Sequence, residues 1–374
     1  MTRVVVAPDK FKGSLTAVEA AEAIALGVRD ALPDAEIVSC PVADGGEGTL
    51  EVLEAAGARI VRLTVRGPLE EPVQARYAVL DGTAYVESAR ACGIEFVEPS
   101  PATALAAHTW GVGELLADAL VHGAKRLVLT VGGTASTDGG AGMLSALGAG
   151  VLDAFGAPVG LGGGTLKRVA STELAPVRER LDGVPVAVAT DVTNPLLGPE
   201  GAAAVFGPQK GAGPAEVALL DEALGRWAHA LQVGGAPDVT RVPGAGAGGG
   251  VAAGAIAGLG AAVESGFDLI AGLTGVDEAL DGADLVITGE GSLDEQSLNG
   301  KAPAGIADRA RPRGVPLIAL AGRIELGPEG LARLGVVGSS ALIDHAPSLE
   351  HARKHAAELL RARAAELVRA WWAR

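Results

Sequence analysis

Five turns in the sequence combine glycine with carboxylate, hydroxyl or lysine side chains. Each follows a short apolar run typical of a β-strand, and the turns occupy residues 7–15, 41–49, 132–142, 190–198 and 288–301. In open α/β sheets, ligands bind at the carboxyl ends of the strands, where such turns gather. These turns are therefore the candidate positions for binding and catalysis.

The turn at residues 132–142 is suited to a phosphate group. It runs from a predicted strand into a predicted helix, so glycine N–H groups and the helix N-terminus could face an anion. It is not a P-loop, because no Gly-Lys-Ser/Thr follows. No Gly-x-Gly-x-x-Gly opens the first predicted strand–helix unit, which disfavours a dinucleotide oxidoreductase. A tight strand–helix turn without a ligand is the competing interpretation.

Carboxylates in these turns could bind a divalent cation or accept a proton: Asp44, Asp191, Glu290 and Asp294. A single loop carboxylate is usually solvated or caps a helix, but four in strand-end turns favour a functional set. Lysines beside the turns could bind anionic groups: Lys10, Lys12, Lys210 and Lys301. Together these residues predict an enzyme that uses a nucleotide or phosphate, a divalent metal and a small anionic substrate.

Other kinds of chemistry are not supported. The six histidines show no metal-ligand spacing, and no Gly-x-Ser-x-Gly nucleophile motif occurs. Cys40 and Cys92 are the only cysteines, which excludes a disulfide framework. We expect both to be small buried residues.

The composition excludes several partners. A net charge of −15 and an aromatic content of 3% argue against nucleic-acid binding. The uncharged segment 242–263 is mostly Gly and Ala, with few of the large apolar residues that drive membrane insertion. The apolar run after Met1 is too short for a signal peptide. We therefore expect a cytoplasmic protein without a membrane span.

Glycine is unusually frequent, with 55 of 374 residues, roughly twice ordinary usage. One group lies in the turns described above. A second group, in residues 244–260, has no acid, lysine or hydroxyl within it. We expect the backbone of this second group to pack closely against a neighbouring element.

The elements that must position the turns alternate between strands and helices. Most predicted strands are continuous apolar runs, typical of a parallel sheet buried on both faces; they occupy residues 3–7, 35–41, 59–65, 73–79, 84–88, 126–131, 184–190, 283–288, 316–321 and 335–342. Predicted helices occupy residues 17–32, 48–56, 105–122, 141–148, 215–231, 303–311 and 349–372. The pattern predicts an α/β fold with a doubly wound parallel sheet.

Residues 59–88 interrupt this alternation. Three strand-like runs separated by short turns predict a meander, which suggests that a second domain begins there. We predict a discontinuous first domain, residues 1–61 plus 282–374, and an inserted α/β domain with a mixed sheet, residues 62–281.

In their order and spacing, the five turns resemble those of the bacterial type-1 glycerate kinase family, over almost the whole chain. The third turn reads Thr-Ala-Ser-Thr-Asp from Thr134, where the family more often has Ser-Ala-Thr-Asn-Asp, so the hydroxyls are largely retained. The resemblance implies ATP-dependent phosphorylation of D-glycerate to 2-phosphoglycerate with Mg²⁺. It also implies two different α/β domains, one of them flavodoxin-like, with the active site in the cleft between them.

Roles for individual residues follow as hypotheses from this resemblance. The catalytic residues would be Asp191 as the base, with Asp44 as its rival, and Lys10 to neutralise charge. Phosphate and nucleotide would contact Gly132, Gly133, Thr134, Ser136, Asp138, Gly139, Gly140 and Lys301. The substrate would contact Lys10, Lys12, Ser14, Arg66, Gly45 and Gly46, with Lys10 or Arg66 at its carboxylate. Glu290 and Asp294 would hold Mg²⁺.

Two alternatives remain open: a kinase of another small hydroxy or sugar acid, and a non-catalytic nucleotide-binding regulator. The regulator would need the glycines and lysines but not the four carboxylates together, so their joint presence favours an enzyme. The expected partners are the small molecules glycerate and ATP, with no nucleic acid and no membrane. A homodimer, and the choice between the 2- and 3-hydroxyl, are left open.

Overall fold

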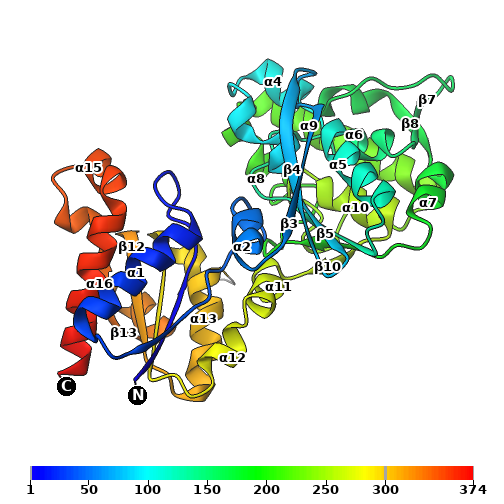
Figure 1. The fold of residues 1–374 in the computed structure, drawn as a ribbon. Coiled ribbons are helices and arrows are strands. Elements are labelled where there is room, and N and C mark those ends of the chain that lie inside the picture. The colour runs from blue at the N-terminus through cyan, green and yellow to red at the C-terminus, as the bar shows by residue number, and fades with distance from the viewer. Residues whose placement is uncertain (1, 299–300, 374) are drawn as a thin grey trace. The chain divides into compact units, whose positions relative to one another are not determined.

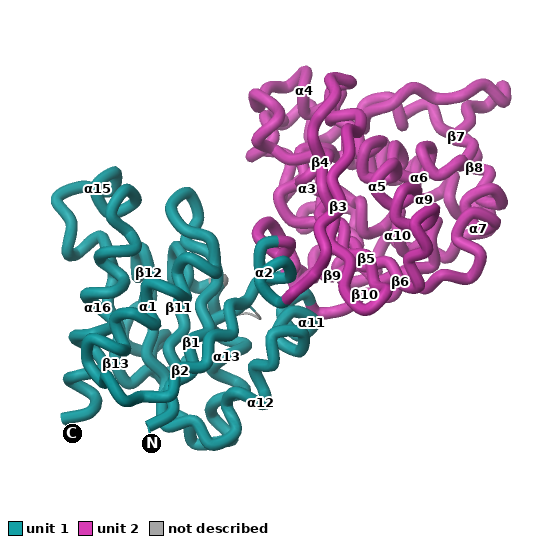
Figure 2. Tube along the Cα trace, in the orientation of Figure 1, with its two compact units in different colours: residues 1–44, 51–56, 266–374 teal, residues 45–50, 57–265 magenta. Residues whose placement is uncertain are grey.

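The computed structural model describes residues 2–298 and 301–373, and the chain forms two compact units (Figures 1 and 2). Unit 1 contains residues 1–44, 51–56 and 266–374, and unit 2 contains residues 45–50 and 57–265. Each unit has its own sheet and its own hydrophobic core. Unit 1 is therefore discontinuous in sequence, and unit 2 is inserted into it.

The sheet of unit 1 has five parallel strands in the order β13-β12-β11-β1-β2. They are β1 (Arg3–Pro8), β2 (Glu36–Ser39), β11 (Leu285–Leu293), β12 (Leu317–Ile324) and β13 (Val336–Ala341). Counted within the unit, this order is 2-1-3-4-5, which is the flavodoxin-like arrangement.

Both faces of this sheet are covered by helices, which explains its continuous apolar strands (Figure 1). Val4 and Val6 of β1 pack on one face with α1 (Ala17–Ala31) and α16 (Ala356–Trp372). The alternate residue Val5 packs on the other face, in the cluster that includes α12 and α13. The remaining helices of the unit are α11 (Gly266–Leu273), α12 (Val276–Leu280), α13 (Ala302–Ala310), α14 (Pro328–Leu334) and α15 (Leu349–Lys354).

Local signals fix where these helices begin and end. Thr16 caps α1 through a reciprocal pair of bonds with Glu19, in which each side chain accepts the other's backbone N–H. The single helix predicted over residues 349–372 is wrong in one respect: it is two helices, α15 and α16, divided at His355. Ser348 is the N-cap of α15, and its hydroxyl accepts a bond from the His351 N–H at 3.1 Å.

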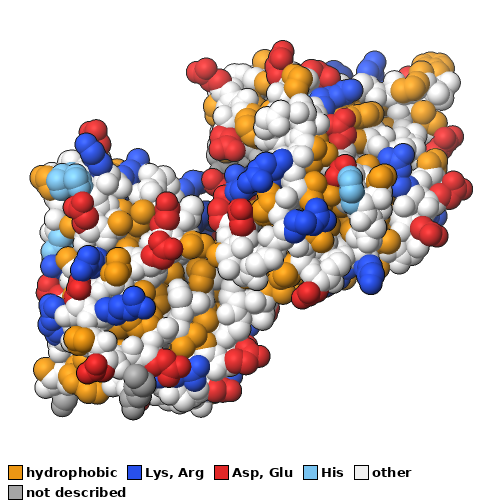
Figure 3. Space-filling model, in the orientation of Figure 1, with side chains coloured by type: hydrophobic (Ala, Val, Ile, Leu, Met, Phe, Trp, Pro, Cys, Tyr) orange, Lys and Arg blue, Asp and Glu red, His pale blue; other side chains and the backbone are white. Residues whose placement is uncertain are grey.

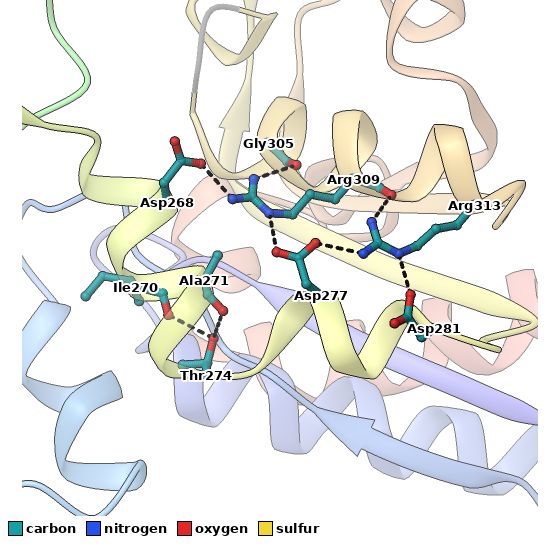
Figure 4. Close-up of polar contacts among 9 residues, drawn as sticks. All are labelled: Asp268, Ile270, Ala271, Thr274, Asp277, Asp281, Gly305, Arg309 and Arg313. Carbon is teal, nitrogen blue, oxygen red and sulfur yellow. Dashed lines mark hydrogen bonds and ion pairs between the residues drawn. The ribbon is translucent and has the colours of Figure 1, made fainter.

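A network of ion pairs joins α11 and α12 to α13 in unit 1 (Figure 4). Arg309 of α13 donates to Asp268 at 2.7 Å and to Asp277 at 3.3 Å. Arg313 lies 3.1 Å from Asp277 and donates to Asp281 at 2.8 Å. Asp277 of α12 therefore bridges the two arginines, and Asp268 ties α11 to α13 through Arg309.

Unit 2 contains a six-stranded mixed sheet in the order β10-β9-β6-β5-β4-β3. The strands β3, β4 and β5 pair antiparallel as the predicted meander, whereas β5, β6, β9 and β10 are parallel. Their bounds are β3 (Arg59–Arg66), β4 (Pro72–Leu80), β5 (Thr83–Glu87), β6 (Arg126–Thr130), β9 (Val186–Ala189) and β10 (Ala262–Glu264). A separate hairpin, β7 (Gly150–Asp153) and β8 (Val169–Glu173), was not predicted from the sequence, and neither was β10.

Helix α2 (Thr49–Ala55) spans the boundary between the units. The other helices of unit 2 pack around its sheet. They are α3 (Ala89–Cys92), α4 (Pro101–Ala106), α5 (Trp110–Val121), α6 (Ala141–Ala146), α7 (Ala175–Leu181), α8 (Ala202–Phe206), α9 (Pro214–Val233) and α10 (Val251–Leu259). The helix predicted over residues 105–122 is instead two helices, because the chain turns at Ala107–Thr109, where the His108 N–H bonds to the Pro68 carbonyl.

The uncharged glycine-rich stretch packs backbone against backbone, as predicted. A Cβ on Gly249 would collide with the Ser136 carbonyl, and one on Gly254 would collide with the Gly139 carbonyl. The second half of the stretch forms the buried helix α10, which the sequence did not predict. Within the described parts of the chain, no helix combines the length and apolar character needed to cross a membrane. Acidic and basic side chains are intermixed over the face drawn in Figure 3.

Candidate active site

The strand order of unit 1 reverses between β1 and β11, a point beside which open α/β sheets bind ligands. Asp9 and Lys10 directly follow β1, and Glu290 lies in β11. The last residue of β11 that pairs with β1 is Gly289, opposite Pro8. Asp9 and Glu290 therefore lie next to each other where the pairing of the two strands ends.

The carboxylate of Asp9 is buried at this edge. The residue is 5% exposed, and its Oδ1 accepts a hydrogen bond from the Lys10 backbone N–H at 2.6 Å. Burial raises the pKa of Asp9 to about 7; Lys10 opposes this shift, and the charges of Asp44 and Glu290 add to it. The sequence assignments gave Asp9 no role, although its place directly after a buried strand is the signal that could have identified it.

Glu290 is also buried, at 7% exposure, and its Oε1 has no hydrogen-bond partner among the residues that the structure describes. Burial raises the pKa of Glu290 to about 7, and the Ser297 hydroxyl and Lys301 oppose the shift. The charges of Asp294 and Asp44 add to it. An unpartnered buried carboxylate oxygen is costly, and a bound cation would satisfy it.

Lysines accompany these acids. Lys10 Nζ lies 3.9 Å from Asp44 Oδ1, and both side chains are partly exposed. Lys301 is the residue before α13. Asp294 lies in the turn before it, where its N–H donates to the Ser297 hydroxyl at 3.0 Å. Five predicted site residues thus lie in this part of unit 1. Together with Asp9 we call them the carboxylate–lysine cluster: Asp9, Lys10, Asp44, Glu290, Asp294 and Lys301.

Lys12 and Ser14, predicted to contact the substrate, lie in the turn after β1. Phe11 and Leu15 pair across this turn, and the Ser14 hydroxyl donates to the Phe11 carbonyl at 2.9 Å. Lys12 is exposed, and its backbone nitrogen would be 3.0 Å from a Cβ on Gly291 of β11. The turn therefore lies against the strand that carries Glu290.

The carboxylate–lysine cluster offers oxygen ligands, the type that Mg²⁺ prefers. Within residues 2–298 and 301–373, no three His, Cys, Asp or Glu side chains converge as a ready-made metal site. Mg²⁺ is usually held by one or two carboxylates with phosphates and waters, so Glu290 and Asp294 fit such a site. Asn299 and Gly300, which belong to the fifth turn, lie outside the described residues.

In unit 2, the carboxyl ends of the parallel strands β5, β6 and β9 lie at one edge, where two glycine turns meet. A Cβ on Gly132 would lie 2.8 Å from the Cα of Gly46, so this contact requires glycine. Gly133 and Gly45 have φ angles of 73° and 75°, which other residues rarely adopt. The turn predicted for phosphate and the turn predicted for substrate are thus neighbours.

Glu87 and Arg90, to which the sequence assignments gave no role, support these turns. Glu87 ends β5; its Oε1 accepts the Leu50 N–H at 2.8 Å, and its Oε2 accepts the Arg90 Nε–H at 2.7 Å. Leu50 follows the turn that contains Gly45 and Gly46, so the buried carboxylate fixes that turn to the end of the strand. Only the position of Glu87 at a strand end could have indicated this role.

Asp138 is fully buried, and the protein's own donors occupy its carboxylate. Its Oδ2 accepts bonds from the Thr109 N–H and hydroxyl at 2.9 and 2.8 Å, and from the Gly142 N–H at 3.1 Å. Its Oδ1 accepts bonds from the Ser136 hydroxyl at 3.2 Å and the Gly140 N–H at 3.1 Å. Asp138 therefore holds the third turn together from within.

The accessible part of the third turn is its beginning. Gly132 is half-buried and Gly133 is exposed, whereas the later predicted residues of the turn are buried: Thr134, Ser136, Gly139 and Gly140. The Thr134 hydroxyl lies 2.6 Å from the Ser88 hydroxyl and donates to the Val131 carbonyl. The backbone N–H groups at the start of the turn are thus its best candidates for a phosphate contact.

Lys210, predicted from its position as an anion binder, is 3% exposed. Its Nζ donates to the Ser136 carbonyl and lies 3.5 Å from the Thr137 hydroxyl. Burial lowers its pKa to about 8. A Cβ on Gly249 would be 2.7 Å from this Nζ, so the lysine links the third turn to the glycine-rich stretch.

Asp191 lies at the same edge of unit 2 as the glycine turns. Thr130 of β6 pairs with Ala189 of β9, so Gly132 and Asp191 each lie two residues beyond that pair. Asp191 is half-buried.

Arg66 is the last residue of β3 in unit 2. It pairs with Pro72 next to the turn of the β3–β4 hairpin. Pro72 lies six residues before Ala78, where β4 begins to pair with β5. Its guanidinium is 3.2 Å from Glu70 and lies 4.5 Å from the ring centre of Trp110. The side chain of Arg66 therefore contacts Glu70 and Trp110.

The sequence profile of the glycerate kinase family matches residues 4–372. A glycerate kinase from Halalkalibacterium halodurans is 41% identical over 376 residues, which cover 99% of each chain. The chain belongs to the glycerate kinase family.

Further similarities agree with this membership. A glycerate 2-kinase from Escherichia coli is 44% identical over 325 residues, covering 86% of this chain and 85% of that protein. A crystal structure from Salmonella typhimurium LT2, described as a glycerate kinase 2, matches with a TM-score of 0.84 and 40% identity, covering 100% of this chain and 98% of that chain. The predicted α/β fold is confirmed, and so is the prediction of a kinase that transfers phosphate to an alcohol group.

Proposed function

We propose that this kinase phosphorylates D-glycerate to 2-phosphoglycerate, with ATP and Mg²⁺, by direct in-line transfer of the γ-phosphoryl group. The observation that carries the proposal is the buried, unpartnered Oε1 of Glu290 at the strand-order reversal of unit 1, in a chain of the glycerate kinase family. Phosphoryl transfer needs positioning and charge neutralisation more than covalent chemistry, and the carboxylate–lysine cluster supplies groups for both.

Glu290 and Asp294 are the proposed ligands of Mg²⁺. When bound, the ion would neutralise and orient phosphate oxygens. Burial keeps part of the Glu290 population protonated near neutral pH, and a cation beside it would favour the ionised form. Lys301 acts on the same carboxylate and would add positive charge next to the phosphates.

The proposed base is Asp191, at the strand edge of unit 2 that carries the glycine turns. It would orient the attacking hydroxyl and remove its proton. Asp44 is the alternative, but its carboxylate is already engaged by Lys10. The N–H groups of Gly132 and Gly133 would bind phosphate oxygens.

The test is a product analysis. Purified protein is incubated with ATP, Mg²⁺ and D-glycerate, and the product is identified by phosphorus NMR beside ADP release. We expect 2-phosphoglycerate in amounts equal to the ADP formed. No ADP above background would contradict the function. A 3-phosphoglycerate product would contradict only the choice of hydroxyl, and faster turnover of another hydroxy acid would contradict only the substrate.

The proposed compartment is the cytoplasm. Both cysteines are free and buried, and burial raises the pKa of Cys40 to about 11 and that of Cys92 to about 12. Such thiols need no oxidising compartment and react slowly. Fractionation of cells that express the chain with an epitope tag would test this location.

A further inference from the structure

We propose that Arg90 binds the carboxylate of the substrate, and that Glu87 is the positioning residue that holds Arg90 for this task. The inference rests on the proposed function for the identity of the acid, D-glycerate. It adds Arg90 of unit 2 as a cation for the substrate carboxylate, a role for which the sequence suggested only Lys10 or Arg66.

The first observation is the asymmetric burial of the pair. The Glu87 side chain is 1% exposed, whereas that of Arg90 is 21% exposed. Glu87 is anchored on its other oxygen by the Leu50 N–H. The carboxylate thus fixes the Nε end of the guanidinium from the protein interior, while part of the arginine reaches the surface.

The second observation is the position of Arg90 beside both glycine turns. Arg90 lies in α3, and a Cβ on Gly133 would be 3.4 Å from the Cβ of the neighbouring residue Ala89. The Ile94 N–H donates to the Gly133 carbonyl at 2.9 Å, so the segment around α3 runs along the third turn. Through Glu87 and Leu50, the same segment is joined to the turn that contains Gly46.

The third observation is chemical. A guanidinium has five N–H donors in a planar fork, so a bond from Nε to Glu87 is compatible with a second oxyanion on the same group. A carboxylate and a phosphate share this oxyanion chemistry, so the test must separate glycerate from ATP.

The experiment compares Arg90→Lys with a matched control, Arg62→Lys, at an exposed arginine of β3 in the same unit. Lysine keeps the charge beside Glu87 but cannot make a fork of bonds to a carboxylate. D-Glycerate binding without ATP is measured by equilibrium dialysis, and KM is measured for D-glycerate and for ATP. We expect Arg90→Lys to weaken D-glycerate binding about 10- to 100-fold, the loss of a charged hydrogen bond, with KM for ATP within about twofold. The control should match the wild type.

Unchanged D-glycerate affinity would overturn the inference, and so would a rise confined to the KM for ATP, which would assign Arg90 to phosphate. Absence of ADP formation by the wild type would contradict the proposed function alone, because the dialysis still decides whether Arg90 binds the acid. If Arg90→Lys does not fold, phenylglyoxal labelling of the wild type gives the answer. D-Glycerate, but not glycerol, should slow modification of the peptide that contains Arg90, and equal labelling with both would overturn the inference.

Discussion

The two units present the same structural feature, the carboxyl edge of parallel strands, with different chemistry. In unit 1, this edge carries lysines and acids, burial raises the pKa of Asp9 and Glu290, and a buried oxygen of Glu290 is left without a partner in the described chain. In unit 2, the edge carries glycine turns whose buried polar groups, such as Asp138 and Lys210, are bonded within the protein.

This difference shows that a buried charge does not by itself mark a binding site. Asp138 is more deeply buried than Glu290, yet five donors satisfy it, so it acts as a scaffold. Glu290 is buried with one oxygen unsatisfied, so a ligand would complete it. The missing partner, rather than the burial, distinguishes the two edges.

The largest effect is expected where the base is removed from the edge of unit 2. Asp191→Asn should lower kcat about 10³-fold, because general-base catalysis typically contributes 10²- to 10⁴-fold. The control is Asp182→Asn, at a left-handed C-cap with φ 46° that asparagine tolerates, and its kcat should match the wild type. A kcat of Asp191→Asn within about threefold of wild type would move the base to Asp44 in unit 1.

A smaller effect is expected from the glycine contact in unit 2. Gly132→Ala places a methyl group 2.8 Å from the Gly46 Cα, and overpacking of this kind costs about 1–3 kcal/mol of unfolding free energy. We expect kcat/KM for ATP to fall about tenfold, since displacing the turn weakens its phosphate contacts. Gly160→Ala is the control, because its Cβ would meet only a Thr165 methyl at 3.8 Å. Equal behaviour of the two variants in urea unfolding and in kinetics would refute the tight contact.

A third prediction concerns the buried lysine of the scaffold. Burial lowers the pKa of Lys210 to about 8 from 10.5, so between these pH values the native state binds fewer protons than the unfolded chain. Its contribution to stability therefore rises with pH in that window. The unfolding free energy of the wild type relative to Lys210→Met should increase by about 1 kcal/mol from pH 7.5 to 9. Denaturant titrations at both pH values measure this, and a constant difference would be evidence against the lowered pKa.

The smallest effect is expected in the ion-pair network of unit 1. Arg309→Met removes bonds to Asp268 and Asp277, whose side chains are 62% and 46% exposed. Solvent-exposed pairs contribute below about 1 kcal/mol each, so thermal unfolding should shift by only a few degrees, and less at high salt. Kinase activity is measured on the same variant. A loss of activity larger than this small loss of stability can explain would show that the network acts on the site after residue 301.

Much of the fold could be predicted, because the strands of unit 1 and the centre of unit 2 are continuous apolar runs between turn residues. Several of the elements that were missed have weak local signals, and the helices α3, α7, α8, α11, α12 and α14 were not predicted either. The hairpin of β7 and β8 and the strand β10 are short, and α10 is so rich in Gly and Ala that it has little amphipathic pattern. The break between α4 and α5 depends on a bond from His108 to Pro68, forty residues away, which no local pattern contains.

The candidate site could be predicted only in part. Asp44 and Glu290 were found because they lie in glycine-rich turns that follow predicted strands. Asp138 has the same local appearance, and its role depends on donors such as Thr109, twenty-nine residues away, that only the folded chain brings together. Glu87 and Arg90 were missed because no glycine run lies beside them, and the contact between Glu87 and Leu50 is also long-range.

The contrast between the edges is tested most directly by metal binding. Mn²⁺, which favours the same oxygen ligands as Mg²⁺, can be titrated into the protein while electron paramagnetic resonance follows the free ion. We predict a single tight site in the wild type that Glu290→Gln weakens by at least about tenfold, through loss of a charged oxygen ligand. Asp191→Asn, at the edge of unit 2, should bind as the wild type does. Wild-type affinity in Glu290→Gln, or a loss confined to Asp191→Asn, would contradict the assignment of the metal to unit 1.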